Sequence, residues 1–533
     1  MRWHAPHWRD NPILLTMIWA TILFAFVLAM PAHAQLTELY AFQYNPTSTS
    51  NYPDGQTPLA ELIQGADGNY YTTTFAGGSG GCPSEVEGTT AGCGAVVKIS
   101  STGTFSVVYS FPYTSATNSA SNGMGPQAGL LQASDGNFYG VTTAGGTAGA
   151  NFCVTSVGIT GCGTIFKLTP AGKLTVLHDF CGPDGCGVLT TDGDVPMGRL
   201  VEASNGDLYG TTEQGGFADS LYNQGTIFRI SRSGTYKILH LFTGAASTGD
   251  GENPTAGLTY ASNGDFYGTT EFGGASGFGT VFKMTTAGTV TILHSFAEDD
   301  PDGQQPMGPL VQASNGNLYG TCYAGGANGA GTVFQISTSG TFKKLYDFTQ
   351  STGSVGDFPK AGLIQASDGN LYGTAWENGE GGPGSIYQIT TAGVATLEAT
   401  FVPSSTGFAP TGALVQGDDG RLYVTLPDNG GFNSSDVQDQ GAISVLNLGL
   451  APPAPAISTF SPASGKVGAK VTLEFGPYVG ATSVTFNGVS AKFVVQGSEF
   501  ISATVPTGAT TGPIRVTTPG GTVTSTKSFT VLP

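Results

Sequence analysis

The stretch Gly362–Gly373, GLIQASDGNLYG, recurs along the chain with small changes and decides the fold. Its Asp/Asn-Gly step occurs seven times, at Gly68, Gly136, Gly206, Gly264, Gly316, Gly369 and Gly420. The repeats are roughly 50–70 residues long, which is typical of stacked or circular repeat architectures. An Asx-Gly step between two alternating apolar and polar segments predicts a β-hairpin, because such turns need positive φ.

Each repeat carries four strand-like segments. The first begins Pro-x-(Ala/Gly)-x-Leu, and the second follows the Asx-Gly turn and reads NLYGT or similar. The third resembles GTIFKL at Gly163–Leu168, and the fourth ends in an aromatic signal such as LHDF at Leu177–Phe180. Four antiparallel strands in each of seven repeats predict an all-β protein, with a seven-bladed β-propeller over residues 35–450.

The two ends of this repeat region complement each other. The seventh repeat stops at Gly449 without a fourth strand, whereas Leu36–Phe42 is a fourth strand with no repeat before it. We expect the N-terminal strand to complete the last blade and close the ring, which removes an exposed sheet edge. An open solenoid is the alternative, and it leaves Leu36–Phe42 unpaired.

Residues 1–34 have the pattern of a secretory signal peptide. Arg2 and Arg9 make the start basic, Ile13–Met30 is apolar, and Ala32-His33-Ala34 is a small-x-small cleavage site. An uncleaved membrane anchor is the alternative. We expect a secreted or cell-surface protein without a transmembrane segment after the signal. The net charge of −18 argues against nucleic acid as a partner.

The C-terminal part differs in composition from the repeats. Residues 451–456, APPAPA, read as a Pro-rich linker. In residues 457–533, short alternating segments are separated by Gly and Pro turns. This pattern predicts a second domain, a small immunoglobulin-like β-sandwich.

The cysteines fit an exported protein with local disulfides. Cys82 and Cys93 lie in one loop, and Cys153 and Cys162 lie in the equivalent loop of the next repeat. The third candidate pair brackets the short stretch CGPDGC, at Cys181 and Cys186. The sequence does not fix the connectivity. Cys322 is left over and replaces the last Thr of YGTT, so we expect a buried thiol there, with a reactive thiol as the alternative.

Several known families resemble parts of this chain. Leu363–Thr374 (LIQASDGNLYGT) and Gly279–Phe296 (GTVFKMTTAGTVTILHSF) resemble the Gloeobacter/Verrucomicrobia-type tandem repeat of choice-of-anchor proteins. That resemblance implies an exported, surface-associated bacterial protein of unassigned activity. Ser461–Gly468, Val484–Gly488 and Gly512–Gly521 resemble an IPT/TIG domain. The NLYGT segment is also similar to blades of two-component sensor propellers, and the Asp-Gly turn is similar to the sialidase Asp-box.

One position differs from repeat to repeat although its neighbours are nearly uniform. It directly follows the second strand and leads into the loops that vary in length; around the ring it reads Phe75, Thr143, Glu213, Glu271, Tyr323, Trp376 and Pro427. Aromatic faces beside carboxylates can stack on and hydrogen-bond a sugar, so we take Phe75, Glu213, Glu271, Tyr323 and Trp376 as candidate ligand-binding residues. Glu213 and Glu271, in adjacent repeats, could act as an acid/base pair. Ordinary loop variation is the alternative.

Three histidines and two acidic loops are weaker candidates for a metal site. His178, His240 and His294 occupy one position in consecutive repeats, and Tyr40, Tyr109 and Tyr346 fill that position elsewhere. We expect a packing position on the outer strand rather than a metal site. The acidic loops Glu298–Asp302 and Asp192–Asp194 offer oxygen ligands suited to Ca²⁺, and solvated loop charge is the alternative.

The sequence leaves three functions open. No nucleophile–base motif is recognisable, so the first expectation is a non-enzymatic binding or scaffold protein that binds a carbohydrate or a surface protein through the variable-loop face. A secreted carbohydrate-active hydrolase or lyase is the alternative. A purely structural surface component is the third. No cofactor is expected apart from the candidate Ca²⁺.

Overall fold

In the computed structural model, the described part of the chain consists of residues 35–43, 52–79, 92–113, 120–146, 161–180, 192–216, 224–244, 249–298, 301–351, 354–378, 382–402, 406–427 and 441–533. Every element with assigned bounds in these residues is a β-strand, so the predicted all-β class is confirmed. No helix within the described ranges is long and apolar enough to cross a membrane.

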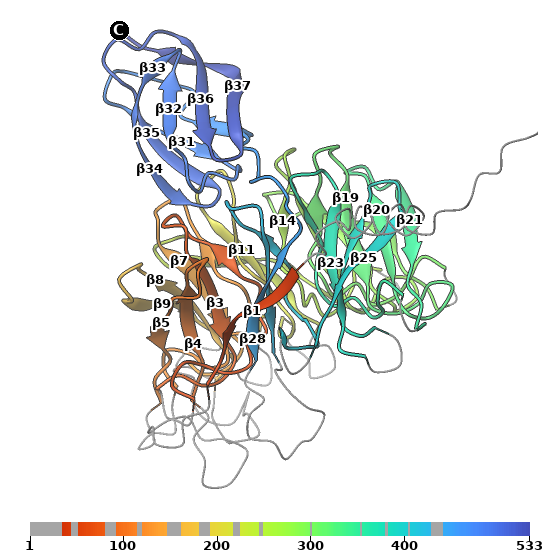
Figure 1. Ribbon diagram of the computed structural model, residues 1–533. Coiled ribbons are helices and arrows are strands. Elements are labelled where there is room, and N and C mark those ends of the chain that lie inside the picture. Colours follow the sequence, from red (N-terminus) through yellow and green to blue (C-terminus); the bar gives the residue numbers. More distant parts are fainter. Residues whose placement is uncertain are drawn as a thin grey trace, which may run out of the picture.

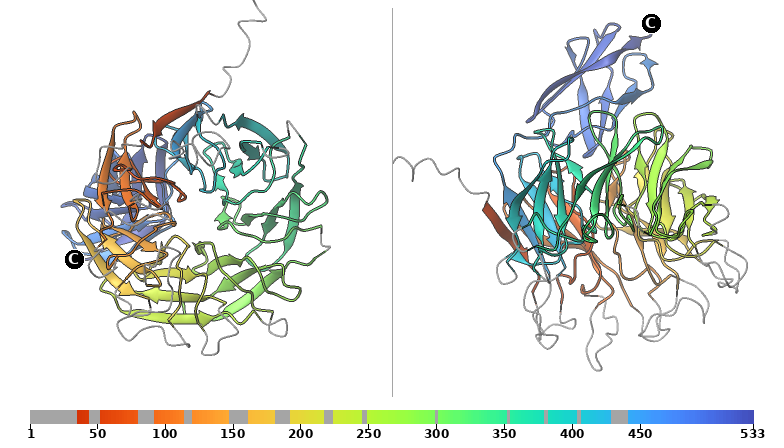
Figure 2. Two further views of the ribbon diagram at one scale, coloured as in Figure 1. Left: turned by 90° about the horizontal axis from the view of Figure 1, so that it is seen from below. Right: turned by 90° about the vertical axis from the view of Figure 1, so that its right-hand side faces the viewer.

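The repeat region forms seven four-stranded antiparallel sheets, which stand side by side in a propeller-like ring (Figures 1 and 2). In six sheets the strands follow chain order, as in β22-β23-β24-β25. The strands are β1 (Gln35–Ala41), β2 (Ile63–Gln64), β3 (Tyr70–Thr74), β4 (Ala95–Ile99), β5 (Phe105–Ser110), β6 (Leu131–Gln132), β7 (Phe138–Thr142), β8 (Thr164–Leu168), β9 (Leu174–Asp179), β10 (Val201–Glu202), β11 (Leu208–Thr212), β12 (Thr226–Ile230), β13 (Tyr236–Leu241), β14 (Thr259–Tyr260), β15 (Phe266–Thr270), β16 (Thr280–Met284), β17 (Val290–Ser295), β18 (Val311–Gln312), β19 (Leu318–Cys322), β20 (Thr332–Ile336), β21 (Phe342–Asp347), β22 (Ile364–Gln365), β23 (Leu371–Ala375), β24 (Ser385–Ile389), β25 (Ala395–Thr400), β26 (Val415–Gln416), β27 (Leu422–Leu426) and β28 (Ala442–Asn447).

The second strand of each sheet is buried on both faces. All five residues of β23 are buried, whereas the fourth strand β25 is partly exposed along its length. Gly373 in β23 has no side chain because the ring of Tyr387 lies over it: a Cβ there would be 2.6 Å from Tyr387 Cζ. The LYG motif therefore lets an aromatic side chain of the third strand pack directly on the backbone of the second.

The N-terminal strand closes the ring. β1 pairs antiparallel with β28, from Gln35 opposite Asn447 to Ala41 opposite Ala442, and so becomes the outer strand of the last sheet. Figure 2 shows the red N-terminal strand beside the blue strands of that sheet. The predicted closure by this strand is confirmed.

The Gln of GLIQASDGNLYG joins neighbouring sheets. The backbone N–H of Ser314 donates to Gln365 Oε1 of the next repeat at 2.7 Å, and Gln365 Nε2 donates to the Gly369 carbonyl of its own turn at 2.8 Å. At the seam between the last and first repeats, the Asp418 N–H donates to Gln64 Oε1 at 3.0 Å, and Gln64 Nε2 donates to Asp418 Oδ1 at 2.6 Å. The same kind of hydrogen bond therefore links internal junctions and the seam.

The Asx-Gly turn is held by its own strand. Asp368 Oδ2 accepts hydrogen bonds from the Tyr372 hydroxyl and from Asn370 Nδ2, each at 2.9 Å. Three repeats have Asn in place of Asp, and its side-chain amide donates to the equivalent tyrosine hydroxyl, as from Asn263 to Tyr267. These contacts occupy the turn side chains within the scaffold.

The C-terminal module, residues 457–533, contains two sheets around its own apolar core, with strand orders β29-β31-β35-β34 and β30-β37-β36-β32-β33. It lies on the ring face that carries the Asx-Gly turns (Figure 1). Tyr260 of the ring and Phe475 of the module have ring centroids 5.4 Å apart. The strands are β29 (Thr459–Ser461), β30 (Ser464–Gly465), β31 (Lys470–Glu474), β32 (Ser483–Phe486), β33 (Val489–Ser490), β34 (Lys492–Gly497), β35 (Phe500–Thr504), β36 (Gly512–Thr518) and β37 (Gly521–Val531).

Several sequence-based predictions concern residues that the structure does not describe. Residues 1–34 lie outside the described ranges, and so do Cys82, Cys153, Cys181 and Cys186. Cys93 and Cys162 are fully buried at equivalent places in consecutive repeats. The three disulfide pairings stay predictions. Cys322 is a buried thiol, as expected.

Candidate functional site

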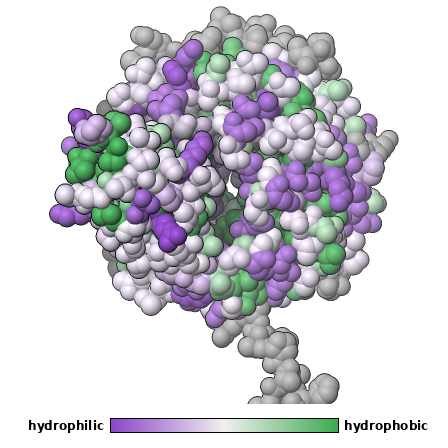
Figure 3. Space-filling model, turned by 90° about the horizontal axis from the view of Figure 1, so that it is seen from above, coloured by the Kyte–Doolittle hydropathy of each residue, from purple (hydrophilic) through white to green (hydrophobic). Residues whose placement is uncertain are grey.

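An axial cavity of about 940 Å³ lies between the first strands of the repeats and the C-terminal module. All seven Pro-x-(Ala/Gly)-x-Leu segments contribute to its wall, and most of their lining side chains are apolar. Seen from the module's side, the ring face is hollowed near its middle, and hydrophilic side chains surround much of the hollow (Figure 3). The repeat pattern therefore builds a largely apolar wall in which a few charged side chains stand out.

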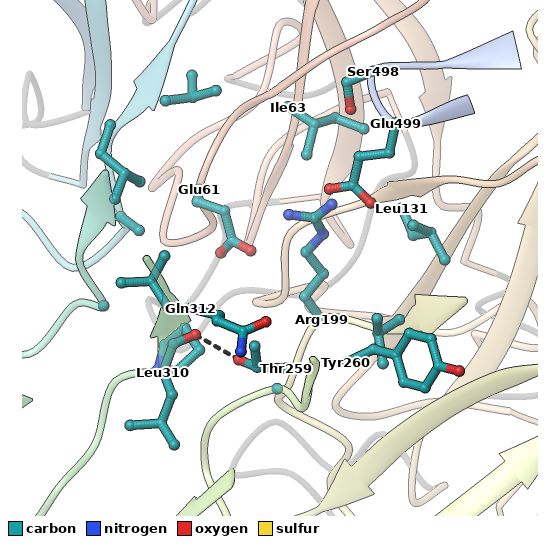
Figure 4. A pocket seen from close by; sticks show the side chains of 18 of the residues that line it. Glu61, Ile63, Leu131, Arg199, Thr259, Tyr260, Leu310, Gln312, Ser498 and Glu499 are labelled. Atoms are coloured by element: carbon teal, nitrogen blue, oxygen red, sulfur yellow. Dashed lines mark hydrogen bonds between the residues drawn. The ribbon is translucent and has the colours of Figure 1, made fainter. Parts of the chain in front are cut away.

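Charged residues, among them Glu61, Arg199 and Glu499, mark the part of this cavity that is near the module. Figure 4 shows the Arg199 guanidinium between the carboxylates of Glu61 and Glu499, and Glu499 belongs to the C-terminal module. Glu61 has room because the next repeat has Gly129: a Cβ there would lie 2.5 Å from Glu61 Cδ. The module thus contributes a carboxylate to a cavity built mainly by the ring.

The variable position after each second strand is fixed by a recurrent backbone contact. The Glu213 N–H donates to the Val195 carbonyl, and the Trp376 N–H donates to the Phe358 carbonyl. Each acceptor residue directly precedes the proline of a first strand and has positive φ, as in Val195 at 52°. This conformation is unfavourable for a β-branched residue and persists only where the surroundings impose it. We call these variable positions the rim. They lie beside the residues that precede the first strand of each repeat. The opposite end of each first strand leads to the Asx-Gly turn, on the ring face that carries the module.

Two rim carboxylates of adjacent repeats are linked through Asn253. Its side-chain amide donates to the backbone oxygen of Glu213 at 3.1 Å, and its own carbonyl accepts from the Glu271 N–H at 3.0 Å. Burial raises the pKa of Glu213, and burial together with the nearby Glu213 charge raises the pKa of Glu271. The predicted pair is therefore brought into electrostatic contact at one side of the rim.

Asp194 joins this pair and was not predicted as part of it. Its backbone pairs with that of Gln214, the residue after Glu213. Burial raises the pKa of Asp194 to about 7, and the Glu213 charge adds to this effect. The two rim carboxyl groups and the neighbouring Asp194 therefore all have raised pKa values, a feature that is often found at functional sites.

The aromatic residues of the rim surround a lysine. Lys360 Nζ lies 3.4 Å from the ring centroid of Trp376 and 5.4 Å from that of Tyr323. The Tyr323 ring also packs against Phe358, with centroids 5.3 Å apart. Burial lowers the pKa of Lys360, and Glu377 partly offsets this effect. One face of Trp376 is thus covered by an ammonium group.

Phe75 is separated from the other candidate residues. It belongs to the first repeat, and its ring packs on the second, where a Cβ on Gly125 would lie 2.9 Å from Phe75 Cε2. Glu213, Glu271, Tyr323 and Trp376 occupy four consecutive repeats, the third to the sixth. The structure therefore gathers four of the five predicted residues into one arc of the rim and places Phe75 in a packing contact outside it.

The histidines and acidic loops meet each other at the outer strands. The His178 ring stacks on Tyr236 of the next repeat at a centroid distance of 3.8 Å, and its Nε2 lies 3.1 Å from Asp192 Oδ1. His294 similarly lies 3.6 Å from Asp302. Within the described ranges, no cluster of three or more metal-ligating side chains is present. Asp299 and Asp300 lie outside those ranges, and the Ca²⁺ site stays a prediction.

Sequence reasoning missed Glu61, Arg199, Lys360 and Asp194. The first three occupy the variable places of Pro-x-(Ala/Gly)-x-Leu, where other repeats have mostly uncharged residues. A charged residue at a repeat position that is mostly uncharged elsewhere is the sequence signal that could have identified these three residues. Asp194 was assigned to a loop as a candidate Ca²⁺ ligand, although it stands two residues before Pro196 in the segment that leads into the first strand.

The comparisons with known proteins concern the repeats and the fold. Residues 31–260 and 217–438 match the family model described as the Gloeobacter/Verrucomicrobia repeat. No curated protein is similar in sequence. A copper complex of a fungal alcohol oxidase of the AA5 family is 14% identical, with a TM-score of 0.45, and the match covers 92% of this chain and 100% of that one.

Two further solved structures have a similar fold. The PQQ-bound aldose sugar dehydrogenase from Streptomyces coelicolor is 12% identical, with a TM-score of 0.36 over 79% of this chain and 100% of that one. A luciferin-regenerating enzyme is 14% identical, with a TM-score of 0.35 over 59% of this chain and 89% of that one.

These solved structures are enzymes by name. The expectation of a non-enzymatic binding or scaffold protein is therefore wrong, and the enzyme alternative is the better supported one. Likeness at this level describes the fold alone. The reaction and the residues that perform it have to be argued from the side chains of this chain.

Proposed function

The chain belongs to the Gloeobacter/Verrucomicrobia repeat family, and we propose that its carboxylate-bearing rim makes it an enzyme that cleaves glycosidic bonds by acid–base catalysis. The observation that carries this proposal is the link through Asn253, which ties the backbones of Glu213 and Glu271 in adjacent repeats. Most glycoside hydrolases use two carboxyl groups of different protonation state that act on one substrate.

Each carboxyl group takes a separate role. Glu271, whose pKa is raised by burial and by Glu213, protonates the oxygen of the leaving sugar. Glu213 is the base, which removes a proton from water in a hydrolase or from the sugar ring in a lyase. Asp194 is a positioning residue: it is neutral below its pKa of about 7, so it leaves Glu213 free of a second negative charge.

The finer architecture belongs to the same proposal. We infer that the seven sheets are the blades of a β-propeller over residues 35–450 and that residues 457–533, after the linker 451–456, form an IPT/TIG-type immunoglobulin-like domain. The strand orders and the separate apolar core of the C-terminal module support this division. Export through a signal peptide at residues 1–34, to the cell surface or the medium, agrees with a polysaccharide substrate.

The test is depolymerisation of a panel of neutral and acidic polysaccharides by the protein from Gln35 onward. New reducing ends without ultraviolet absorbance indicate hydrolysis, and unsaturated, absorbing ends indicate a lyase. Glu213→Gln and Glu271→Gln should each lower kcat by about 100- to 10,000-fold, the range of general acid–base catalysis. Glu38→Gln, a change at an exposed carboxylate of the outer strand β1, is the matched control and should keep full activity. No cleavage of any polysaccharide, or equal activity of the two rim variants and wild type, would overturn the proposal.

A further inference from the structure

Lys360 is the one cation at its level of the axial wall. It directly follows the proline of the Pro-x-(Ala/Gly)-x-Leu segment in the sixth repeat. The other repeats have uncharged residues at that position: Leu59, Gln127, Met197, Thr255, Met307 and Thr411. It lines the axial cavity, and the rim residues Trp376 and Tyr323 hold its ammonium group. The position therefore belongs to both the cavity and the rim.

Within the described residues, the ammonium group has aromatic neighbours and no carboxylate at ion-pair distance. In the described ranges, the ion pairs formed by lysines involve Lys98, Lys167, Lys283 and Lys344, and Lys360 forms none. The negative charge of Glu377 acts on Lys360 and partly offsets the effect of burial on its pKa. The Trp376 and Tyr323 faces stabilise the cation without neutralising its charge.

At this one position, in a chain whose net charge is −18, the arrangement suits an anion better than a neutral sugar. A pyranose ring cannot stack on the face of Trp376 that the ammonium group covers. A carboxylate or sulfate entering from the cavity would gain a charge-assisted hydrogen bond to Lys360 in a partly desolvated site. We propose that the substrate is an acidic polysaccharide whose carboxylate or sulfate group pairs with Lys360 while its glycosidic bond lies at the carboxylates of the same rim. This inference rests on the proposed function of the rim.

The test is binding of three matched oligosaccharides by isothermal titration calorimetry. Oligogalacturonate carries carboxylates, an oligosaccharide of carrageenan carries sulfates, and a β-galactan oligosaccharide of equal length is neutral. The protein is the chain from Gln35 onward with Glu213→Gln, so that bound oligosaccharide is not consumed. At least one anionic ligand should bind about tenfold tighter than the neutral one, and salt should reduce the difference. The two anionic arms distinguish a uronate from a sulfate ester as the recognised group.

Variants of Lys360 connect the preference to this side chain. Lys360→Met keeps the length and the contact with Trp376 but should abolish the anion preference, whereas Lys360→Arg should retain it. Lys237→Met removes an exposed lysine of the outer strand β13 and should change nothing. Equal or tighter binding of the neutral ligand, or an anion preference that survives Lys360→Met, would overturn the inference.

The two proposals fail in different ways. Cleavage of neutral galactan with no activity on either anionic polymer would leave the proposed function standing and overturn the assignment of Lys360. Lys360-dependent binding of an anionic oligosaccharide, without cleavage by the protein with Glu213 intact, would overturn the proposed function. Thermal melting of each variant identifies any loss caused by unfolding, and Lys360→Arg keeps the test valid if Lys360→Met is unstable.

Discussion

Asn253 donates a hydrogen bond from its side-chain amide to the backbone oxygen of Glu213, 3.1 Å away in the neighbouring repeat. Asn253 has φ of 53°, a conformation that asparagine and glycine tolerate better than other residues. Asn253→Gly removes the amide without adding backbone strain, and the second repeat already has Gly125 at this place. We expect Asn253→Gly to cost about 1 kcal/mol of stability and to lower kcat, because the backbone of Glu213 loses its hydrogen bond from the amide, whereas the backbone bond to Glu271 remains.

The control for Asn253 is Gln305→Gly, the same change in the next repeat, where the rim residue is Tyr323. Denaturant unfolding and polysaccharide cleavage are measured for both variants. Equal loss of kcat in both would contradict the link between Asn253 and the carboxylate pair.

Ring closure can be tested with the glutamine that joins the sheets. Gln64 makes two hydrogen bonds with Asp418 across the seam, and Gln312 makes the corresponding contact with Ser262 at an internal junction. In a closed ring the seam is equivalent to the other junctions. Gln64→Ala and Gln312→Ala should therefore lower the free energy of unfolding by similar amounts, about 1–3 kcal/mol, in urea denaturation. A Gln64→Ala protein as stable as wild type would mean that the seam is open in solution.

The raised pKa of Asp194 predicts a pH dependence with a defined sign. Its pKa rises from 3.8 to about 7 on folding, so the folded protein binds more protons than the unfolded chain between these values. This residue therefore makes the folded state less stable as pH rises from about 4 to 7, and Asp194→Asn should remove that part of the dependence. Urea unfolding over this pH range measures it. A pH profile identical to wild type would show that Asp194 titrates normally.

Asp194 should also shape the activity profile. Above its pKa it becomes charged beside Glu213, so we expect activity to fall above pH 7. In Asp194→Asn the alkaline limb should move to higher pH while the protein remains active, as expected of a positioning residue. Complete loss of activity at every pH would instead assign Asp194 a direct part in the reaction.

Glu474 predicts that attachment of the C-terminal module depends on pH. This side chain is 7% exposed, and burial raises its pKa to about 7, with a further contribution from Glu202 of the ring. Glu202 itself accepts from Ser134 and lies 3.2 Å from Arg232. Above pH 7 a charged Glu474 would face Glu202, so docking should weaken as pH rises.

Limited proteolysis at residues 451–456 measures this docking, with faster cleavage expected at pH 8 than at pH 6. Glu474→Gln should cleave slowly at both pH values. Lys492→Gln, a change at an exposed lysine of the same module, should follow wild type. Cleavage of Glu474→Gln that accelerates with pH as in wild type would assign the dependence to another group.

The repeat pattern predicted the scaffold because its signals are local. Asx-Gly turns, alternating segments and the orphan strand Leu36–Phe42 each specify a hairpin or an edge without knowledge of distant residues. The sheet-joining role of Gln365 was invisible, because its partner Ser314 is in another repeat and no local pattern distinguishes this glutamine from a surface residue.

The rim was only partly predictable. Repeat-to-repeat variation found Glu213, Glu271, Tyr323 and Trp376, because uniform neighbours made the variable position stand out. It also selected Phe75, which packs on Gly125, since variation alone does not separate packing from function. Lys360 follows the proline of its repeat, and Asp194 precedes the proline of its own repeat. Only the folded structure brings Lys360 beside Trp376 and Asp194 beside Glu213.

The pairing of β1 with β28 has a consequence for biogenesis. Gln35 finds its partner Asn447 only after the last repeat has been made, so the earliest described strand has to wait for nearly the whole ring. Closing so long a loop costs more entropy than forming any hairpin within a repeat. Until then, the growing chain exposes a sheet edge at each end, and those edges have to be kept apart from other chains until the ring is complete.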